Sequence, residues 1–128
     1  MINTLGLSIH HLGVALDLET FHELTFNVKV NDDKVQGVQT YFIFDQRFNC
    51  FIEYFTISGR AQNYSPGFHH VCYNVKNEEE FKVLQTTFKE NRIGFQITNL
   101  ENSGSTECNK VAFFFFKKFG IVEFNVCD

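Results

Sequence analysis

The stretch Ile9–Val14 (IHHLGV) reappears farther along the chain as Phe68–Tyr73 (FHHVCY). A second stretch, Cys50–Phe55 (CFIEYF), reappears as Gly120–Asn125 (GIVEFN). Each half of the chain therefore carries a histidine pair on one apolar segment and a glutamate on another. Because the phrases recur in the same order, we expect a duplicated module whose second copy contains extra looped residues.

The composition predicts one globular domain with a real core. The chain has 128 residues, of which 44% are hydrophobic and 20% charged. Its net charge of −4 and the lack of a basic stripe argue against a nucleic-acid partner. The longest apolar run, Val111–Phe116, is too short to span a bilayer, and the first residues do not resemble a signal peptide. We therefore expect a cytoplasmic protein without a membrane partner.

Four cysteines stand at positions 50, 72, 108 and 127, and none forms a C-x-x-C pair. The strong thiol signature of a metal site is therefore absent. An even number of cysteines does not indicate a disulfide framework in a chain with this much core. We expect reduced thiols, as in a cytoplasmic protein.

Each half reads as a strand, a helix, a strand and a two-stranded hairpin. In the first half we expect a helix at 18–25 and strands at 8–16, 26–31, 36–45 and 48–57. In the second half we expect a helix at 77–91 and strands at 67–75, 95–99, 110–117 and 119–126. Modules at about 1–58 and 66–128 would then be joined by the polar segment 58–67, and the polar loop 99–109 could act as a lid.

The second helix has the clearest boundaries. Asn77 can cap its first turn, and Glu80 stands three positions later beside two further acids, which suits the positive end of the helix dipole. Phe81, Leu84 and Phe88 repeat at helical spacing and should pack on a sheet.

Alternation along the two histidine strands distinguishes the members of each pair. It places His11 and His70 on a face lined by small residues, and His10 and His69 on the opposite, large apolar face. A single such histidine is more often structural, but the recurrence in register favours a functional pair. We expect His11 and His70 to be metal ligands and the large apolar face to be core.

Glu53 and Glu123 each lie between large apolar residues in the middle of a strand. A buried carboxylate is costly unless it is paired or bound to a metal, although a glutamate on an edge strand could face water. Two imidazoles and two carboxylates suit one divalent transition metal, namely Zn, Ni, Co, Fe or Mn. Such a metal could act as a Lewis acid that stabilises an enolate or enediolate, with one glutamate as the base.

These residues resemble the vicinal oxygen chelate superfamily, the glyoxalase and bleomycin-resistance fold, over nearly the whole chain. Within it, Gly67–Val71 (GFHHV) is similar to the G-L-H-H-I strand of methylmalonyl-CoA epimerases, and Val35–Val38 (VQGV) to their E-Q-G-V segment. The last strand, Gly120–Phe124 (GIVEF), resembles the closing G-V-L-I-E-L of that family.

The resemblance implies an α+β fold in which two βαβββ modules form a half-open, mixed-sheet barrel around the metal. It places the four metal positions on His11, Glu53, His70 and Glu123. It also implies a divalent-metal-dependent isomerase or epimerase that transfers a proton next to a metal-chelated carbonyl, with Glu123 and Glu53 as catalytic candidates. The implied substrate is a small molecule such as an acyl-CoA or other thioester, and the implied assembly is a homodimer.

The chain also departs from the epimerase pattern. Thr40 stands where epimerases often carry an acidic residue, three positions after the glycine of Q-G-V. Glu53 resembles glyoxalases more than those epimerases that have glutamine there. The D-P-x-G signature of glyoxalase I is replaced near the end by Phe116–Gly120 (FKKFG).

Three alternative functions fit parts of the pattern. The first is a glyoxalase I-type lyase, which shares the metal set. The second is an extradiol-type dioxygenase, although that chemistry uses two histidines and one carboxylate, and Glu53 would be a fourth protein ligand. The third is a non-catalytic small-molecule binding or resistance module. An apolar pocket for such a role could be lined by Phe42, Phe51, Phe55 and Phe114.

Overall fold

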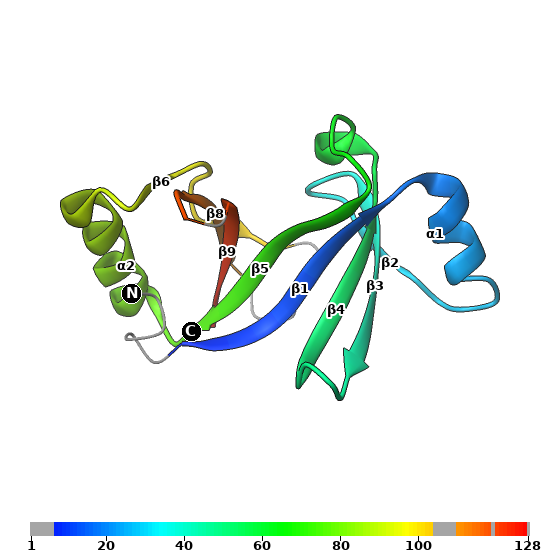
Figure 1. Cartoon of the computed structure of the whole chain (residues 1–128), viewed down its shortest axis with the longest axis horizontal. Coiled ribbons are helices and arrows are strands. Elements are labelled where there is room, and N and C mark those ends of the chain that lie inside the picture. The colour runs from blue at the N-terminus through cyan, green and yellow to red at the C-terminus, as the bar shows by residue number, and fades with distance from the viewer. Residues whose placement is uncertain (1–6, 104–109, 119, 128) are drawn as a thin grey trace.

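A single mixed sheet of nine strands organises the chain (Figure 1). The computed structural model describes residues 7–103, 110–118 and 120–127. Along the sheet the strands run in the order β2-β3-β4-β1-β5-β9-β8-β6, and β7 pairs with β8. The predicted α+β class is therefore confirmed, and the sheet is open rather than closed into a barrel.

The elements of the first half are β1 (Ser8–Leu16), α1 (Leu18–Leu24), β2 (Asn31–Asp33), β3 (Val38–Asp45) and β4 (Cys50–Thr56). A short 3-10 helix follows at Gly59–Ala61. The elements of the second half are β5 (Gly67–Val75), α2 (Glu78–Asn91), β6 (Gly94–Gln96), β7 (Glu101–Asn102), β8 (Lys110–Phe116) and β9 (Gly120–Val126).

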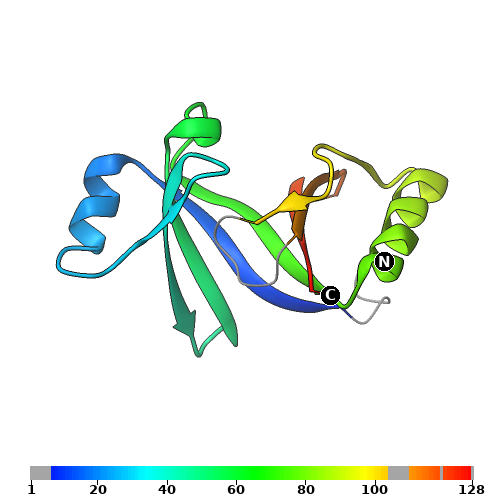
Figure 2. The same cartoon turned by 180° about the vertical axis from the view of Figure 1, so that it is seen from behind.

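The two halves meet along the middle of the sheet. There β1 and β5 pair antiparallel, while β1 pairs parallel with β4 and β5 pairs parallel with β9. The two helices lie at opposite ends of the molecule, as Figures 1 and 2 show from the two sides. The equivalent strands β4 and β9 therefore lie on either side of the central β1–β5 pair, as two copies of one module would place them. The exact division at 1–58 and 66–128 stays a prediction.

Both central strands are interrupted by a β-bulge. The pairing steps from Ile9↔Tyr73 to His11↔Cys72, which leaves His10 as an extra residue in β1. It steps again from Gly13↔His70 to Val14↔Phe68, which leaves His69 as an extra residue in β5. A bulge breaks the strict alternation of side chains. The prediction that His10 and His69 lie opposite His11 and His70 is therefore wrong.

The main core lies between α2 and the second half of the sheet. Phe81, Leu84 and Phe88 from α2 are buried, as the helical spacing predicts, and they pack with residues of β5, β8 and β9. In the first half, however, the small face of β1 is the more buried one, and Ala15 belongs to a small core cluster. The expectation that the large faces form the core is therefore confirmed on β5, where Val71, Tyr73 and Val75 are buried, whereas on β1 the large face is only partly buried and contributes Leu12 to the edge of that core.

Several boundaries differ from the prediction. The strand expected at 26–31 begins only at Asn31, because a turn with Asn27 at φ 61° and a Val28 to Thr25 backbone hydrogen bond comes first. Glu101–Asn102 forms β7 within the predicted polar loop. Residues 104–109 of that loop, and hence most of the proposed lid, lie outside the described residues.

Cys50 and Cys72 are free thiols, whereas Cys127 is disulfide-bonded. The expectation of four reduced thiols is therefore wrong for Cys127, and Cys108 lies outside the described residues. In the part of the chain that the structure describes, neither helix is long and apolar enough to cross a membrane.

Candidate metal centre

Four neighbouring strands each contribute one side chain to a single cluster. His11 comes from β1, Glu53 from β4, His70 from β5 and Glu123 from β9. The order β4-β1-β5-β9 makes these strands consecutive in the sheet. The structure thus brings together all four residues that the repeat predicts.

Strand register explains why the cluster forms. Glu53 pairs with Gly13, two residues beyond His11, and Glu123 pairs with Cys72, two residues beyond His70. Residues two apart on a strand share a face, so each glutamate lies on the same face as the histidine of its own half. The antiparallel pairing of β1 with β5 then joins the two histidine–glutamate pairs.

The ligand atoms converge on one point. The Nε2 atoms of His11 and His70 lie 3.2 Å apart. Glu123 Oε1 is 3.1 Å from each of these nitrogens. Glu53 Oε1 is 3.3 Å from His11 Nε2 and 3.6 Å from His70 Nε2. Tetrahedral ligands about 2.0–2.1 Å from a zinc ion lie about 3.3 Å from one another, so these separations fit a small metal ion.

The environment of the cluster also suits a cation. All four side chains are buried, with residue exposures between 1% and 6%. Within the described part of the chain, no hydrogen bond of acceptable geometry reaches Glu123 Oε1, although two imidazole nitrogens lie close to it. None of the described residues that line the adjoining pocket is Lys or Arg. Two buried carboxylates without a fixed cation need a compensating positive charge.

Without a metal, a proton on an imidazole supplies the positive charge that the two carboxylates need. Burial alone would lower the pKa of His11, but nearby Cys72, Glu123 and Glu53 outweigh burial and raise that pKa well above 6.5. Burial alone would raise the pKa of Glu123, but the imidazoles of His11 and His70 hold it well below its usual range. The protein therefore keeps a carboxylate and a protonated imidazole where a metal would bind.

His10 and His69 contact the far sides of the two candidate ligands. His10 Nδ1 lies 2.7 Å from His11 Nδ1, and His69 Nδ1 lies 2.8 Å from His70 Nδ1. Burial, together with His11, lowers the pKa of His10. Burial, together with His70, lowers the pKa of His69 to about 4. Both partner rings are therefore neutral at pH 7.

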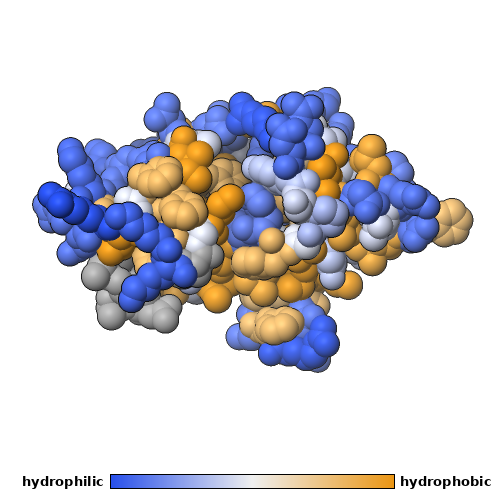
Figure 3. Space-filling view, turned by 45° about the horizontal axis from the view of Figure 1, so that its top comes forward, coloured by the Kyte–Doolittle hydropathy of each residue, from blue (hydrophilic) through white to orange (hydrophobic). Residues whose placement is uncertain are grey.

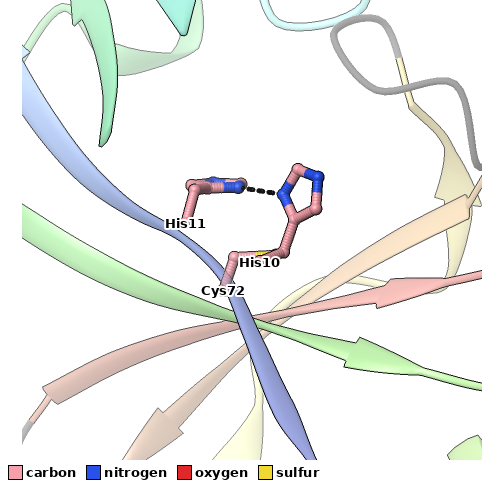
Figure 4. A group of neighbouring side chains, drawn as sticks. All are labelled: His10, His11 and Cys72. Carbon is pink, nitrogen blue, oxygen red and sulfur yellow. Dashed lines mark hydrogen bonds between the residues drawn. The ribbon is translucent and has the colours of Figure 1, made fainter. Parts of the chain in front are cut away.

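A second group with donor atoms close together consists of His10, His11 and Cys72 (Figure 4). The Nδ1 separation of 2.7 Å is a hydrogen-bond distance and is shorter than two nitrogens on a tetrahedral metal would show. In the metal-free protein, burial raises the pKa of the Cys72 thiol to about 12. The geometry therefore favours a hydrogen-bonded pair here and a metal at the four-residue cluster.

Gly13 makes room for one of the histidines. A Cβ atom built on Gly13 would overlap the imidazole ring of His70. The ring thus occupies the space that any other residue would fill at this position. A glycine inside a strand commonly marks such a close approach, although nothing in the sequence showed which group approaches it.

The cluster opens into a pocket with a mixed lining. Phe55 lines this pocket as predicted, together with Phe113, Tyr64 and His69. Phe114 lies instead in the core against α2, because it points to the opposite face of β8 from Phe113. Gln36, Tyr64, His69 and Phe113 also line an adjoining cavity of about 240 Å³. A ligand larger than one ion therefore has space beside the cluster.

Asp33 is a third carboxyl group in this pocket, and the sequence pattern did not predict it. It is only 1% exposed, and burial raises the pKa of its side chain. Its Oδ1 accepts the backbone N–H groups of Val35 and Gln36 at 3.0 and 3.1 Å. Thr40 is buried and accepts a hydrogen bond from Asn31. Asp33 ends the short strand β2, so no repeat or alternation signal marks it.

Comparison with known proteins supports the fold. No family model and no curated protein matches the sequence. Among solved structures, a hypothetical protein from Bacillus halodurans is similar, with a TM-score of 0.67 and 22% identity over 95% of each chain. Methylmalonyl-CoA epimerase from Mycobacterium tuberculosis has a TM-score of 0.65 and 14% identity, over 94% of this chain and 87% of that one.

A variant of Streptomyces coelicolor methylmalonyl-CoA epimerase in complex with 2-nitronate-propionyl-CoA has a TM-score of 0.57 and 14% identity, over 93% of this chain and 96% of that one. At these identities the likeness shows the fold alone. The protein thus has the glyoxalase-like α+β fold that these structures share.

Proposed function

We propose that this protein is a divalent-metal-dependent isomerase or epimerase that moves a proton next to a carbonyl group. The observation that carries the proposal is the buried cluster of two imidazoles and two carboxylates at separations of 3.1–3.6 Å. Surrounding apolar strands would exclude bulk water from the reacting centre, and the adjoining cavity offers room for a substrate.

His11, Glu53, His70 and Glu123 would hold the metal, which is Zn, Ni, Co, Fe or Mn. When bound, such an ion supplies positive charge beside the carbonyl oxygen of the substrate. Glu123 would take the proton from the adjacent carbon, and the electron pair of the broken C–H bond would move toward the carbonyl oxygen. Glu53 is the alternative base, because its Oε1 lies farther from the other donor atoms, at 3.6 Å from His70 Nε2.

Asp33 is our candidate for the second proton carrier, the role that Thr40 cannot fill. Its carboxyl group lines the same pocket as Glu53 and Glu123, and burial raises the pKa of this carboxyl group, which favours its protonated form compared with an exposed aspartate. In an epimerisation Asp33 would return a proton to the opposite side of the carbon, as the electron pair moves back from oxygen to that carbon.

We propose an acyl-CoA or other thioester as the substrate class. The support is the similarity in fold to the epimerase in complex with 2-nitronate-propionyl-CoA. A hemithioacetal, the substrate type of a glyoxalase I-type lyase, would require the same metal and the same base. A non-catalytic binding module of the same fold would not need a carboxylate that acts as a base.

The test is solvent deuterium incorporation by the metal-loaded protein into acyl-CoA esters, 2-hydroxy ketones and hemithioacetals. Glu123→Gln should keep most of the metal and lose about 10²-fold or more in exchange rate, the usual scale of general base catalysis. Asp33→Asn should still allow exchange into one epimer but should prevent interconversion of the two. Exchange at the wild-type rate in Glu123→Gln would make Glu123 a ligand only.

Two further outcomes separate the alternatives. If the metal is present and none of the substrate classes exchanges, the binding-module function replaces the enzymatic one. Oxygen uptake with a catechol would instead support the dioxygenase.

We also propose a homodimer, because the β3–β4 hairpin exposes the neighbouring rings of Phe44 and Phe51, whose centroids lie 5.3 Å apart, and because apolar side chains gather over the middle of the face that Figure 3 shows. Light scattering on the purified protein tests the assembly. A cytoplasmic location stays a prediction.

A further inference from the structure

Each candidate histidine ligand has a second histidine on its far side. The contacts join Nδ1 to Nδ1, at 2.7 Å between His10 and His11 and at 2.8 Å between His69 and His70. At such distances one nitrogen must donate a proton and the other must accept it. The arrangement occurs twice, once in each half of the molecule, so a single accidental contact does not explain it.

The ligand role decides which ring donates. An imidazole that binds a metal through Nε2 carries its proton on Nδ1, and Nε2 is the atom that His11 and His70 direct at the cluster. Their Nδ1–H groups must then donate to the Nδ1 atoms of His10 and His69. Metal-bound histidines usually donate this proton to a carboxylate, a backbone carbonyl or water, which fixes the tautomer and the orientation of the ring.

We propose that His10 and His69 are positioning residues, each of which accepts the Nδ1–H of the adjacent metal ligand and thereby fixes its tautomer and orientation. The inference rests on the proposed metal site and extends it. It assigns both histidines of each His-His pair to one centre, with the second residue as ligand and the first as its hydrogen-bond acceptor.

The two β-bulges make this arrangement possible. In a regular strand, adjacent side chains point to opposite faces and their rings do not meet. The extra residue in β1 is His10 and the extra residue in β5 is His69, so each bulge falls on the histidine that we assign as the acceptor. Bulges of this kind re-aim side chains and are frequent beside active sites.

The surroundings hold the two acceptor rings in place by different means. The His69 ring stacks on Tyr64 with centroids 4.1 Å apart and meets the edge of Phe55 at 5.5 Å. The His10 ring packs against Phe42 and Phe51 at 6.1 and 5.9 Å. His69 also lines the pocket and the adjoining cavity, where its buried Nε2 has no hydrogen-bond partner among the described residues. We therefore expect the larger effect from His69.

The test measures zinc affinity of the purified protein by chelator competition in matched variants. In His69→Asn the amide oxygen lies near the position of Nδ1, so an acceptor remains. In His69→Gln the amide lies near the position of Nε2 rather than Nδ1, and in His69→Leu no polar group remains. We expect affinity within about threefold of wild type for the Asn variant and a loss of about 10- to 100-fold for the other two. The same series at His10 should show the same order.

Two readouts separate positioning from packing. The melting temperature of each metal-free variant reports folding, and the visible absorption of the cobalt-loaded protein reports ligand geometry. Altered cobalt spectra for Gln and Leu, with a wild-type spectrum for Asn, would support the inference. Equal losses for Asn, Gln and Leu, or affinities of all three within threefold of wild type, would overturn it.

Failure of the metal site itself would look different. If the wild-type protein binds no divalent metal, the proposed function fails before the variants are compared. Cys72→Ala is the control for the second donor group, and this variant should still bind zinc and should keep the wild-type cobalt spectrum. A thiolate-to-cobalt charge-transfer band that disappears in this variant would place the metal at His10, His11 and Cys72, and would overturn the acceptor role of His10.

Discussion

The imidazole ring of His70 fills the space that a side chain at position 13 would need, which explains why a glycine stands there. We predict that Gly13→Ala moves the His70 ring and weakens metal binding, by the 10- to 100-fold typical when a ligand loses its supported orientation. Metal content after dialysis and zinc affinity measure the effect. Ala15→Gly, a change at the next residue on the same face, is the matched control and should leave metal affinity unchanged.

The raised pKa of His11 makes metal binding depend on pH. In the metal-free protein this ring holds a proton above pH 6.5, so a bound metal must displace it. We predict that the affinity for zinc rises by about tenfold per pH unit from pH 6.5 up to the pKa of His11, with one proton released. Calorimetry in buffers of different ionisation enthalpy counts the proton. A dissociation constant that does not change over this range would contradict the assignment.

The same shift has the opposite consequence for the metal-free fold. A histidine whose pKa is raised by folding stabilises the native state below its unfolded pKa of about 6.5. That contribution is lost as the pH rises through the folded pKa of His11. Alkaline pH thus lowers the stability of the metal-free protein and raises the affinity of the site for a metal.

At the scale of single elements, α2 offers a test that is separate from the site. Asn77 caps the helix by accepting the backbone N–H of Glu80 at 2.9 Å. We predict that Asn77→Ala lowers the free energy of unfolding by about 1 kcal/mol, the usual value of such a cap. Urea denaturation measures the loss, and zinc affinity should stay unchanged because α2 contributes no candidate ligand. A change in affinity would show that α2 and the site are coupled.

The repeat made the strands and the four clustered side chains predictable. Two copies of a His–Glu pattern constrain each other, so His11, Glu53, His70 and Glu123 stood out although each alone is ambiguous. The bulges at His10 and His69 were not predictable, because one extra residue in a strand leaves the local composition unchanged and only the partner strand reveals it. Asp33 escaped for a similar reason, since its burial comes from tertiary packing.

For the whole molecule, we predict that removal of the metal lowers the melting temperature. A ligand that binds only the native state stabilises it by about 2.7 kcal/mol at a free concentration one hundred times its dissociation constant. His70→Ala should lower metal content and melting temperature together. The double variant His11→Ala, His70→Ala should show no shift on addition of zinc, and unchanged metal occupancy in it would refute the site.

The four candidate ligands come from four consecutive strands, two from each half of the sheet. A metal held there would join β4, β1, β5 and β9 side by side, across the seam where the halves meet. Opening either half would then require release of the ion, so the two halves should unfold as one cooperative unit when loaded and more independently when empty. Amide hydrogens in β4 and β9, on opposite sides of the seam, should accordingly exchange with solvent at the same slow rate in the loaded protein and at diverging rates in the empty one.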